Sequence, residues 1–176
     1  MRRFAGVIET MRTAVALGSN LGDRLANLRA ARQAIVQLPN VRPPLLSSPI
    51  YETEPLGCES GAGKFLNAVI EFEYGGEPFD LLQELRRLET ALGRPSEHPR
   101  NVSREIDIDL LYVGDVKIDT KELQLPHPRM HERGFVLQPL ADIRPDLVLP
   151  EQTMSISHLL AQVGGQGEAV RLKQGF

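Results

Sequence analysis

Arg104-Glu-Ile-Asp107-Ile-Asp109-Leu-Leu-Tyr112 is the stretch on which the fold of this chain turns, because it has the pattern of a half-buried β-strand. Side chains alternate between the two faces of a strand, so Asp107 and Asp109 project to one side, roughly 6.5 to 7 Å apart at their roots. The isoleucines and the leucine that alternate with them project to the other side and can enter a core. We therefore expect a strand over about 105–113 that presents two carboxylates to a cleft.

Two carboxylates this close repel each other, and their pKa values are pushed apart or upward unless a cation lies between them. Magnesium suits such a pair, because it accepts one or two protein carboxylates, keeps waters and takes its other ligands from substrate phosphates. An acidic strand face that serves only solubility is the alternative, and Glu105, which shares that face, favours it. The motif alone leaves both interpretations open.

Length and composition indicate one globular domain. The 176 residues are enough for a well-formed core, and the net charge of -3 offers no global electrostatic basis for binding nucleic acid. No apolar run is long enough to span a membrane, and the first residues lack the apolar core of a signal peptide. Because the single Cys58 cannot form an internal disulfide, we expect the reducing cytoplasm. We also expect the protein to be a monomer.

Apolar residues recur at strand or helix spacing along most of the chain. In chain order the pattern predicts a strand at 13–17, a helix at 21–38, a strand at 45–52, a Gly-rich loop at 53–63, a strand at 65–74, a helix through Leu81 and Leu92, the acidic strand, and a short strand at 116–118.

This β-α-β-β-α-β order matches the ferredoxin-like α+β plan, a mostly antiparallel sheet with helices packed on it. A C-terminal helical extension follows, with a short helix at about 132–139 and an amphipathic helix at about 155–163. We expect residues 1–10 to form an N-terminal tail, 11–166 a single domain and 167–176 a flexible C-terminal tail.

Five arginines lie in irregular segments on either side of the acidic strand: Arg94, Arg100, Arg104, Arg129 and Arg133. Any one of them is ordinarily a solvated surface charge. Together they fit polyphosphate, because guanidinium groups neutralise phosphate oxygens while metal ions bridge them. No Walker loop accounts for phosphate binding, since Gly63-Lys64 lacks the Ser or Thr that must follow.

Three other features have both a functional and an ordinary interpretation. His127 lies between two prolines, so it is either a phosphate contact or a neutral loop histidine. Phe65 and Phe135 are either core residues or stacking partners for a flat heterocycle. Gly18-Ser19-Asn20 is either an anion site at a helix start or a tight strand-to-helix turn.

Taken together, these residues resemble the 6-hydroxymethyl-7,8-dihydropterin pyrophosphokinase family of folate biosynthesis. The matching blocks follow the family order from about residue 13 to 150. They are Gly18-Ser-Asn-Leu-Gly-Asp-Arg24, Tyr51-Glu-Thr53-Glu-Pro55-Leu56-Gly57, Phe65-Leu-Asn67, Arg104-Glu-Ile-Asp-Ile-Asp-Leu110, and Pro126-His127 through Arg133-Gly-Phe135.

The resemblance implies transfer of pyrophosphate from ATP to the pterin hydroxymethyl oxygen, with release of AMP. It implies that Asp107 and Asp109 hold two Mg²⁺ ions and act in catalysis with Arg94 and Arg104. The implied pterin-binding residues are Thr53, Pro55, Leu56, Gly57, Phe65, Asn67, Asp107 and Phe135. The implied ATP-binding residues are Glu89, Arg94, Arg104, Leu110, Leu123, Gln124, His127 and Arg133.

The chain departs from the family pattern just before the acidic strand. Many members carry Arg-Trp-Gly-Pro-Arg there, whereas Asn101 replaces the tryptophan here, and Ser96 stands where a loop arginine is common. Two other functions remain open at this point. One is a two-metal nucleotidyl transferase on a ferredoxin-like palm, which would release pyrophosphate, and the other is a non-catalytic ligand-binding module of the same topology.

Overall fold

The computed structural model describes residues 9–55, 61–93, 103–163 and 169–176. Within these residues the strands form one six-stranded sheet and one two-stranded ribbon, and all pairs are antiparallel. The sheet has the order β5-β1-β4-β3-β8, and β2 also pairs with β4. Its strands are β1 (Met11–Ser19), β2 (Val41–Ser47), β3 (Tyr51–Thr53), β4 (Phe65–Tyr74), β5 (Asp107–Val113) and β8 (Val170–Arg171).

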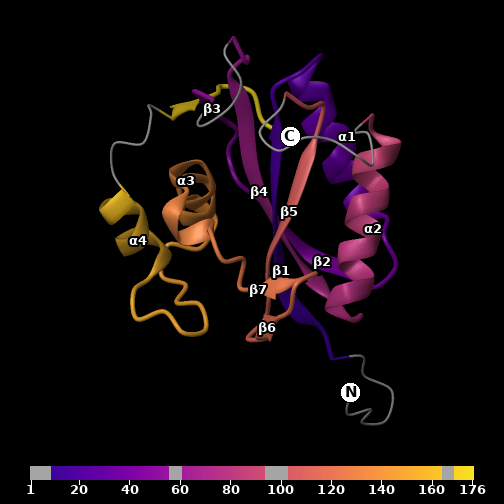
Figure 1. The fold of residues 1–176 in the computed structure, drawn as a ribbon, viewed down its shortest axis with the longest axis vertical. Helices are drawn as coiled ribbons and strands as arrows, with labels where there is room; N and C mark the ends of the chain where they lie inside the picture. The colour runs from indigo at the N-terminus through magenta and orange to yellow at the C-terminus, as the bar shows by residue number, and fades with distance from the viewer. Residues whose placement is uncertain (1–8, 56–60, 94–102, 164–168) are drawn as a thin grey trace.

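The predicted ferredoxin-like plan is confirmed by the way the helices connect these strands. Helix α1 (Arg24–Val36) follows β1, and α2 (Pro78–Ala91) joins β4 to β5. Helix α1 starts where Asp23 accepts a hydrogen bond from the backbone N–H of Ala26, which satisfies one of the free amides of the first turn. Both helices pack on one face of the sheet, as Figure 1 shows.

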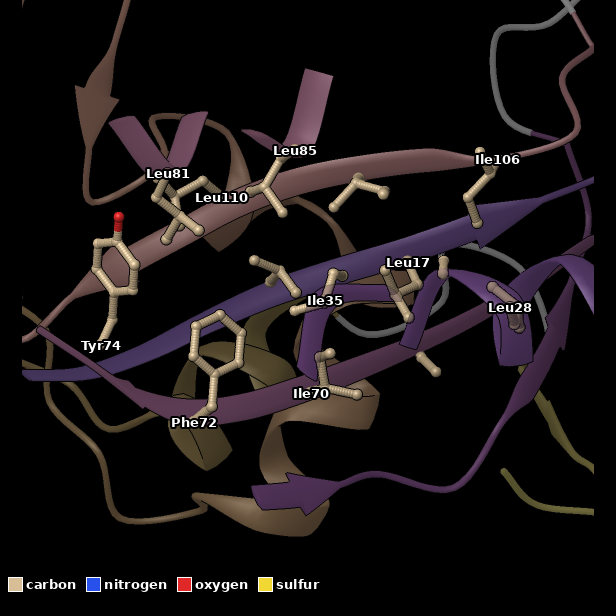
Figure 2. Packing of buried hydrophobic residues seen from close by; sticks show 14 of the residues in the cluster. Leu17, Leu28, Ile35, Ile70, Phe72, Tyr74, Leu81, Leu85, Ile106 and Leu110 are labelled. Atoms are coloured by element: carbon tan, nitrogen blue, oxygen red, sulfur yellow. The ribbon is translucent and has the colours of Figure 1, made fainter. Parts of the chain in front are cut away.

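A large apolar cluster fills the space between that face and the two helices. Leu17 and Phe72 enter it from the sheet, and Leu28 and Leu85 meet them from the helices (Figure 2). The side chains of the first part of β5 alternate as the sequence predicts, with Ile108 and Leu110 buried in this cluster and the two aspartates on the opposite face. The carboxylates therefore project toward the second helical layer.

That second layer is the C-terminal extension, made of α3 (Gly134–Ile143) and α4 (Ile156–Val163). It covers the other face of the sheet (Figure 1), where Ala14, Val69 and Tyr112 form the floor of a second apolar cluster. The sheet thus lies between two helical layers. Among the described residues, no helix is long and apolar enough to cross a membrane.

Several elements differ in extent from the sequence prediction. The strand expected at 45–52 is two strands, β2 and β3, because Pro49, which lies between them, lacks the amide that a continuous ladder needs. The helix expected at 132–139 runs from Gly134 to Ile143 and includes the buried Pro139. The short strand expected at 116–118 is β6 (Ile118–Asp119), which pairs with β7 (Gln124–Leu125).

The two ends of the chain also differ in part from the tails that the sequence predicts. Strand β1 begins at Met11, and residues 1–8 of the expected N-terminal tail lie outside the described residues. The tail expected over 167–176 contains β8, which pairs with the free edge of β3. Its pairing is extended by the backbone N–H of Leu172, which donates to the carbonyl of Ile50.

Candidate active site

The candidate site lies where β1, β4 and β5 meet at one end of the sheet. Gly18 of β1 is directly opposite Asn67 of β4 and Asp107 of β5. A Cβ added to Gly18 would lie 3.3 Å from Oδ1 of Asn67 and 3.9 Å from both Phe65 and Asp107. Phe65, Asn67 and Asp107, which come from two sequence blocks, therefore converge on Gly18. Because glycine has no side chain, the space above the strand is open at this point.

Each carboxylate of β5 is matched by an arginine. Nη1 of Arg104 lies 3.3 Å from Oδ2 of Asp107, and Nη1 of Arg133 donates a hydrogen bond of 3.0 Å to Oδ2 of Asp109. The carboxylates remain partly open to solvent, with exposed side-chain fractions of 25% and 35%. The arginines supply the positive charge that two neighbouring carboxylates need.

The same two arginines lie over the two phenylalanines. The guanidinium carbon of Arg104 is 5.8 Å from the ring centre of Phe65, and that of Arg133 is 5.6 Å from the ring centre of Phe135. Both distances lie within the range of cation–π attraction. The site is thus built from two similar groups, each an aromatic ring, a guanidinium group and a carboxylate.

Thr53 and Asn67 form a buried polar pair beside Phe65. Nδ2 of Asn67 donates to Oγ1 of Thr53 at 2.7 Å, and the two residues are 6% and 8% exposed respectively. Strand pairing places Thr53 opposite Phe65. Pro55 is half-buried just beyond β3. Leu56 and Gly57 of the predicted pterin site lie outside the described residues.

A cavity of about 280 Å³ adjoins the acidic strand on the side of α2 and the β6–β7 ribbon. Both aspartates line it together with most of the predicted ATP contacts, namely Glu89, Leu110, Leu123, Gln124 and His127. The side chain of Glu89 accepts a hydrogen bond of 2.8 Å from the backbone N–H of Ile108, which fixes α2 against β5. Arg86 and Lys121 also line the cavity, and no sequence motif marked them.

His127 is held in one orientation at the edge of this cavity. Its backbone N–H donates to the carbonyl of Leu111, and its Nδ1 accepts from the backbone N–H of Arg129 at 3.2 Å. Burial lowers the pKa of His127, and Arg133 and Arg129 lower it further, while Asp109 acts in the opposite direction. The ring is therefore neutral at pH 7, with Nε2–H as its remaining donor.

The donor set fits magnesium in combination with a phosphate substrate. No group of three or more His, Cys, Asp or Glu side chains arranged for metal binding occurs among the described residues, so the protein offers a carboxylate pair and not a closed cage. Such a pair is what Mg²⁺ uses when substrate phosphates complete its coordination. Within the same residues, Nε of Arg104 is buried without a hydrogen-bond partner, which leaves a donor for an anionic oxygen.

A family model described as 7,8-dihydro-6-hydroxymethylpterin-pyrophosphokinase matches residues 14–145. The chain belongs to this pyrophosphokinase family. The match spans both the strand-end convergence at Gly18 and the segment through Phe135, so it covers every part of the site described above.

Curated relatives in the pyrophosphokinase family also match most of the length of this chain. Proteins named 2-amino-4-hydroxy-6-hydroxymethyldihydropteridine pyrophosphokinase are similar to the chain. The one from Bacillus subtilis (strain 168) is 45% identical over 129 residues, which are 73% of this chain and 75% of that protein. The one from Haemophilus influenzae (strain Rd) is 40% identical over 148 residues, which are 84% of this chain and 90% of that protein.

Solved structures support the fold of the pyrophosphokinase domain. A crystal structure described as HPPK-DHPS in complex with substrates matches with a TM-score of 0.70 at 13% identity, over 87% of this chain. Wild-type Plasmodium falciparum HPPK-DHPS with SDX-DHP matches with a TM-score of 0.68 at 13% identity, over 88% of this chain. This chain spans 43% and 44% of those longer chains, respectively.

The remaining family positions fall outside the description of the structure. Arg94 of the predicted catalytic set lies there, as do Ser96 and Asn101, the two departures from the pyrophosphokinase pattern, and Arg100. Apart from these residues and Leu56 and Gly57, the predicted residues are all described, and strand register, ion pairs or the cavity bring most of them together at one end of the sheet.

Proposed function

We propose that this chain transfers the pyrophosphoryl group of ATP to the hydroxymethyl oxygen of 6-hydroxymethyl-7,8-dihydropterin, with AMP as the second product, in folate biosynthesis. Family membership supports this reaction. The observation that links this reaction to particular residues is that Asp107 belongs to both the expected ATP site and the expected pterin site. It lines the cavity with the expected ATP contacts and lies across Gly18 from Asn67.

Asp107 and Asp109 would hold two Mg²⁺ ions, which supply charge neutralisation along the bridged phosphates when bound. Arg104 and Arg133 already lie against these carboxylates, so they are placed to turn toward phosphate oxygens. His127 adds a neutral Nε2–H donor from the side of the cavity. Pyrophosphoryl transfer asks little covalent chemistry of the protein, and this donor set positions and neutralises the phosphates.

Phe65 and Phe135 would hold the flat pterin ring between them, with the Thr53–Asn67 pair beside its polar edge. The half-buried setting of both rings supports this placement, because a ring committed to the core would be fully covered. We also propose that the protein acts as a monomer of one domain, residues 11–166, in the cytoplasm. The single cysteine supports the reducing compartment.

The test of this function is the identity of the nucleotide product. The purified protein is incubated with magnesium, ATP and the pterin, and the nucleotides are separated by chromatography. We expect AMP that forms only when the pterin is present. Pyrophosphate release in place of AMP would indicate the nucleotidyl transferase, and ATP binding with no turnover would indicate a ligand-binding module.

Replacing Phe65 with alanine is expected to weaken pterin binding about tenfold to a hundredfold, because the ring loses a stacking partner and buried apolar contact. The affinity for a non-hydrolysable ATP analogue should change by less than threefold. Calorimetry of the two ligands measures both values. Phe65→Tyr keeps the ring and serves as the control, so equal weakening in Phe65→Tyr and Phe65→Ala would argue against stacking.

Replacing Gly18 with valine is expected to lower kcat/KM by about tenfold to a hundredfold, because the added side chain would enter the open space where the pterin is expected and misplace it, and a misplacement of about 1 Å can cost about a hundredfold in rate. The added side chain would push against Asn67 and enter the space beside Phe65. Steady-state AMP formation measures the loss. Gly175→Val is the matched control, since a Cβ at Gly175 meets nothing within 4 Å. Full activity in Gly18→Val would place the pterin elsewhere.

A further inference from the structure

Asn20 belongs to the family block Gly18–Arg24. The proposed function gives no role to the polar side chains of this block. The residue follows β1 and is 6% exposed. Its Oδ1 accepts a hydrogen bond of 2.8 Å from the backbone N–H of Arg104. Its Nδ2 donates to the carbonyl of Gly63 at 3.3 Å and to Oγ of Ser103 at 3.1 Å. One buried amide thus joins two segments that are about 40 residues apart in sequence.

A second hydrogen bond, between backbone groups, also joins Asn20 to Arg104. The N–H of Asn20 donates to the carbonyl of Arg104 at 3.1 Å, so both polar backbone groups of Arg104 are held by the same residue. The guanidinium group of Arg104 lies against Asp107 and over Phe65. Asn20 therefore fixes the backbone position of Arg104, from which the Arg104 side chain extends into the site.

The second segment leads directly into Phe65. Asn20 holds the carbonyl of Gly63, and Nη1 of Arg24 donates to the carbonyl of Lys64 at 2.8 Å. The two chains approach so closely that a Cβ on Gly63 would lie 3.2 Å from the backbone oxygen of Asn20. Both carbonyls that precede the Phe65 ring are thus fixed by side chains from the Gly18–Arg24 block.

An anion site at this strand-to-helix turn, one of the two interpretations that the sequence leaves open, finds no support. The amide of Asn20 is already engaged by protein groups. The carboxylate of Asp23 accepts from the N–H of Ala26 at the start of α1, so a negative charge already occupies the helix N-terminus. The polar side chains of Asn20 and Asp23 are therefore already engaged by protein groups.

We propose that Asn20 is a positioning residue that couples the two substrate sites. It holds Arg104, expected to contact ATP, and the approach to Phe65, expected to stack on the pterin, in one hydrogen-bonded unit. Binding of the nucleotide at Arg104 then prepares the pterin side, and the coupling is reciprocal. This inference rests on the proposed function, since it takes from it which substrate each segment meets.

The test is the change in pterin affinity that a nucleotide produces. The dissociation constant of the pterin is measured by calorimetry with and without magnesium and a non-hydrolysable ATP analogue, and the ratio is the coupling factor. We expect Asn20→Ala to reduce this factor about tenfold, as the loss of one or two hydrogen bonds predicts. Asn27→Ala is the matched control, because within the described part of the chain the side-chain amide of Asn27 donates to Ser19 and Leu21, near the same turn, and not to the segments of Gly63 or Arg104.

Asn20→Asp provides a second, nearly isosteric variant. It keeps the acceptor for the Arg104 amide and removes the donors to Gly63 and Ser103, so we expect it to lose the coupling as well. If Asn20→Ala does not fold, the coupling factor of Asn20→Asp is compared with that of the wild type instead. A coupling factor equal to that of the wild type in the folded Asn20 variants overturns the inference, even if both affinities fall together.

The wild-type protein separates this inference from the proposed function. If the wild type forms no AMP, the proposed function fails and the inference fails with it. If the wild type forms AMP but shows no nucleotide effect on pterin affinity, only the inference is overturned. A wild-type factor that Asn27→Ala retains and both Asn20 variants lose is the result that supports it.

Discussion

Replacing Asp107 with asparagine is expected to lower kcat for pterin-dependent AMP formation by about a thousandfold or more. An amide keeps the shape of the side chain but loses the charge that binds magnesium, and a metal ion supplies several kcal/mol of transition-state stabilisation, at about 1.4 kcal/mol for each factor of ten. The fold should persist. The side chains of Asp107 and Arg104 are one-quarter and one-fifth exposed, so water can still reach the Arg104 guanidinium group when the charge at position 107 is lost.

Two measurements separate loss of metal from loss of structure. The first is kcat from nucleotide chromatography at saturating substrates, and the second is the melting temperature with and without Mg²⁺ and an ATP analogue. We expect Asp107→Asn to melt like the wild type alone and to gain less from the ligands, because ligand binding stabilises the folded state by mass action. Asp109→Asn should behave in the same way.

Asp115→Asn is the matched control for this experiment, since Asp115 is exposed in the turn at the other end of the same strand. It should retain full activity. An Asp107→Asn protein that keeps a tenth or more of the wild-type kcat would remove this carboxylate from the metal site. The arginine pairs seen on β5 would then be the whole reason for its acidic face.

The acidic strand shows what the sequence could predict about the site. Strand alternation depends only on local period, so the opposite burial of Ile108 and Asp109 followed directly from the pattern. The partner of each carboxylate was not predictable in this way. Arg133 reaches Asp109 from the start of α3, and this pairing depends on how the C-terminal helices pack on the sheet.

Short strands formed the other limit of prediction. β7 and β8 have two residues each, too few to show a period, and β8 is exposed. Their pairing is decided by which free edge is available, β6 for one and β3 for the other. The role of Asn20 was hidden for a related reason, since its partners Gly63 and Arg104 come from distant loops.

Glu71 is the clearest case of a residue whose setting the sequence did not reveal. It lies in β4 and is only 3% exposed, on the face that α3 covers. Its Oε1 accepts from Nη2 of Arg144 at 2.6 Å and from Nε at 2.9 Å, and its Oε2 accepts from the hydroxyl of Tyr112. Burial and the bond to Glu71 raise the pKa of Tyr112, and Glu71 also raises the pKa of Arg144.

Replacing Glu71 with alanine is therefore expected to lower the free energy of unfolding by about 3 kcal/mol, the lower end of the range for breaking a buried charge pair. The Tyr112 hydroxyl would lose its acceptor in a dry environment, while Arg144, with 30% of its side chain exposed, could still reach water. Urea unfolding followed by circular dichroism measures the change. Glu73→Ala is the control, because Glu73 is on the same strand and face but only half-buried, and we expect a loss below about 1 kcal/mol.

The effect should extend to the site, because α3 begins with the residues that reach it. Arg144 anchors the end of α3 through Glu71, and Asp142 anchors it by accepting from the Tyr51 hydroxyl at 2.6 Å. Arg133 and Phe135 lie at the start of the same helix. We expect Glu71→Ala to raise the KM for the pterin at temperatures where the protein is still folded. A destabilised variant with an unchanged KM would show that the start of α3 is held by the Arg133–Asp109 pair alone.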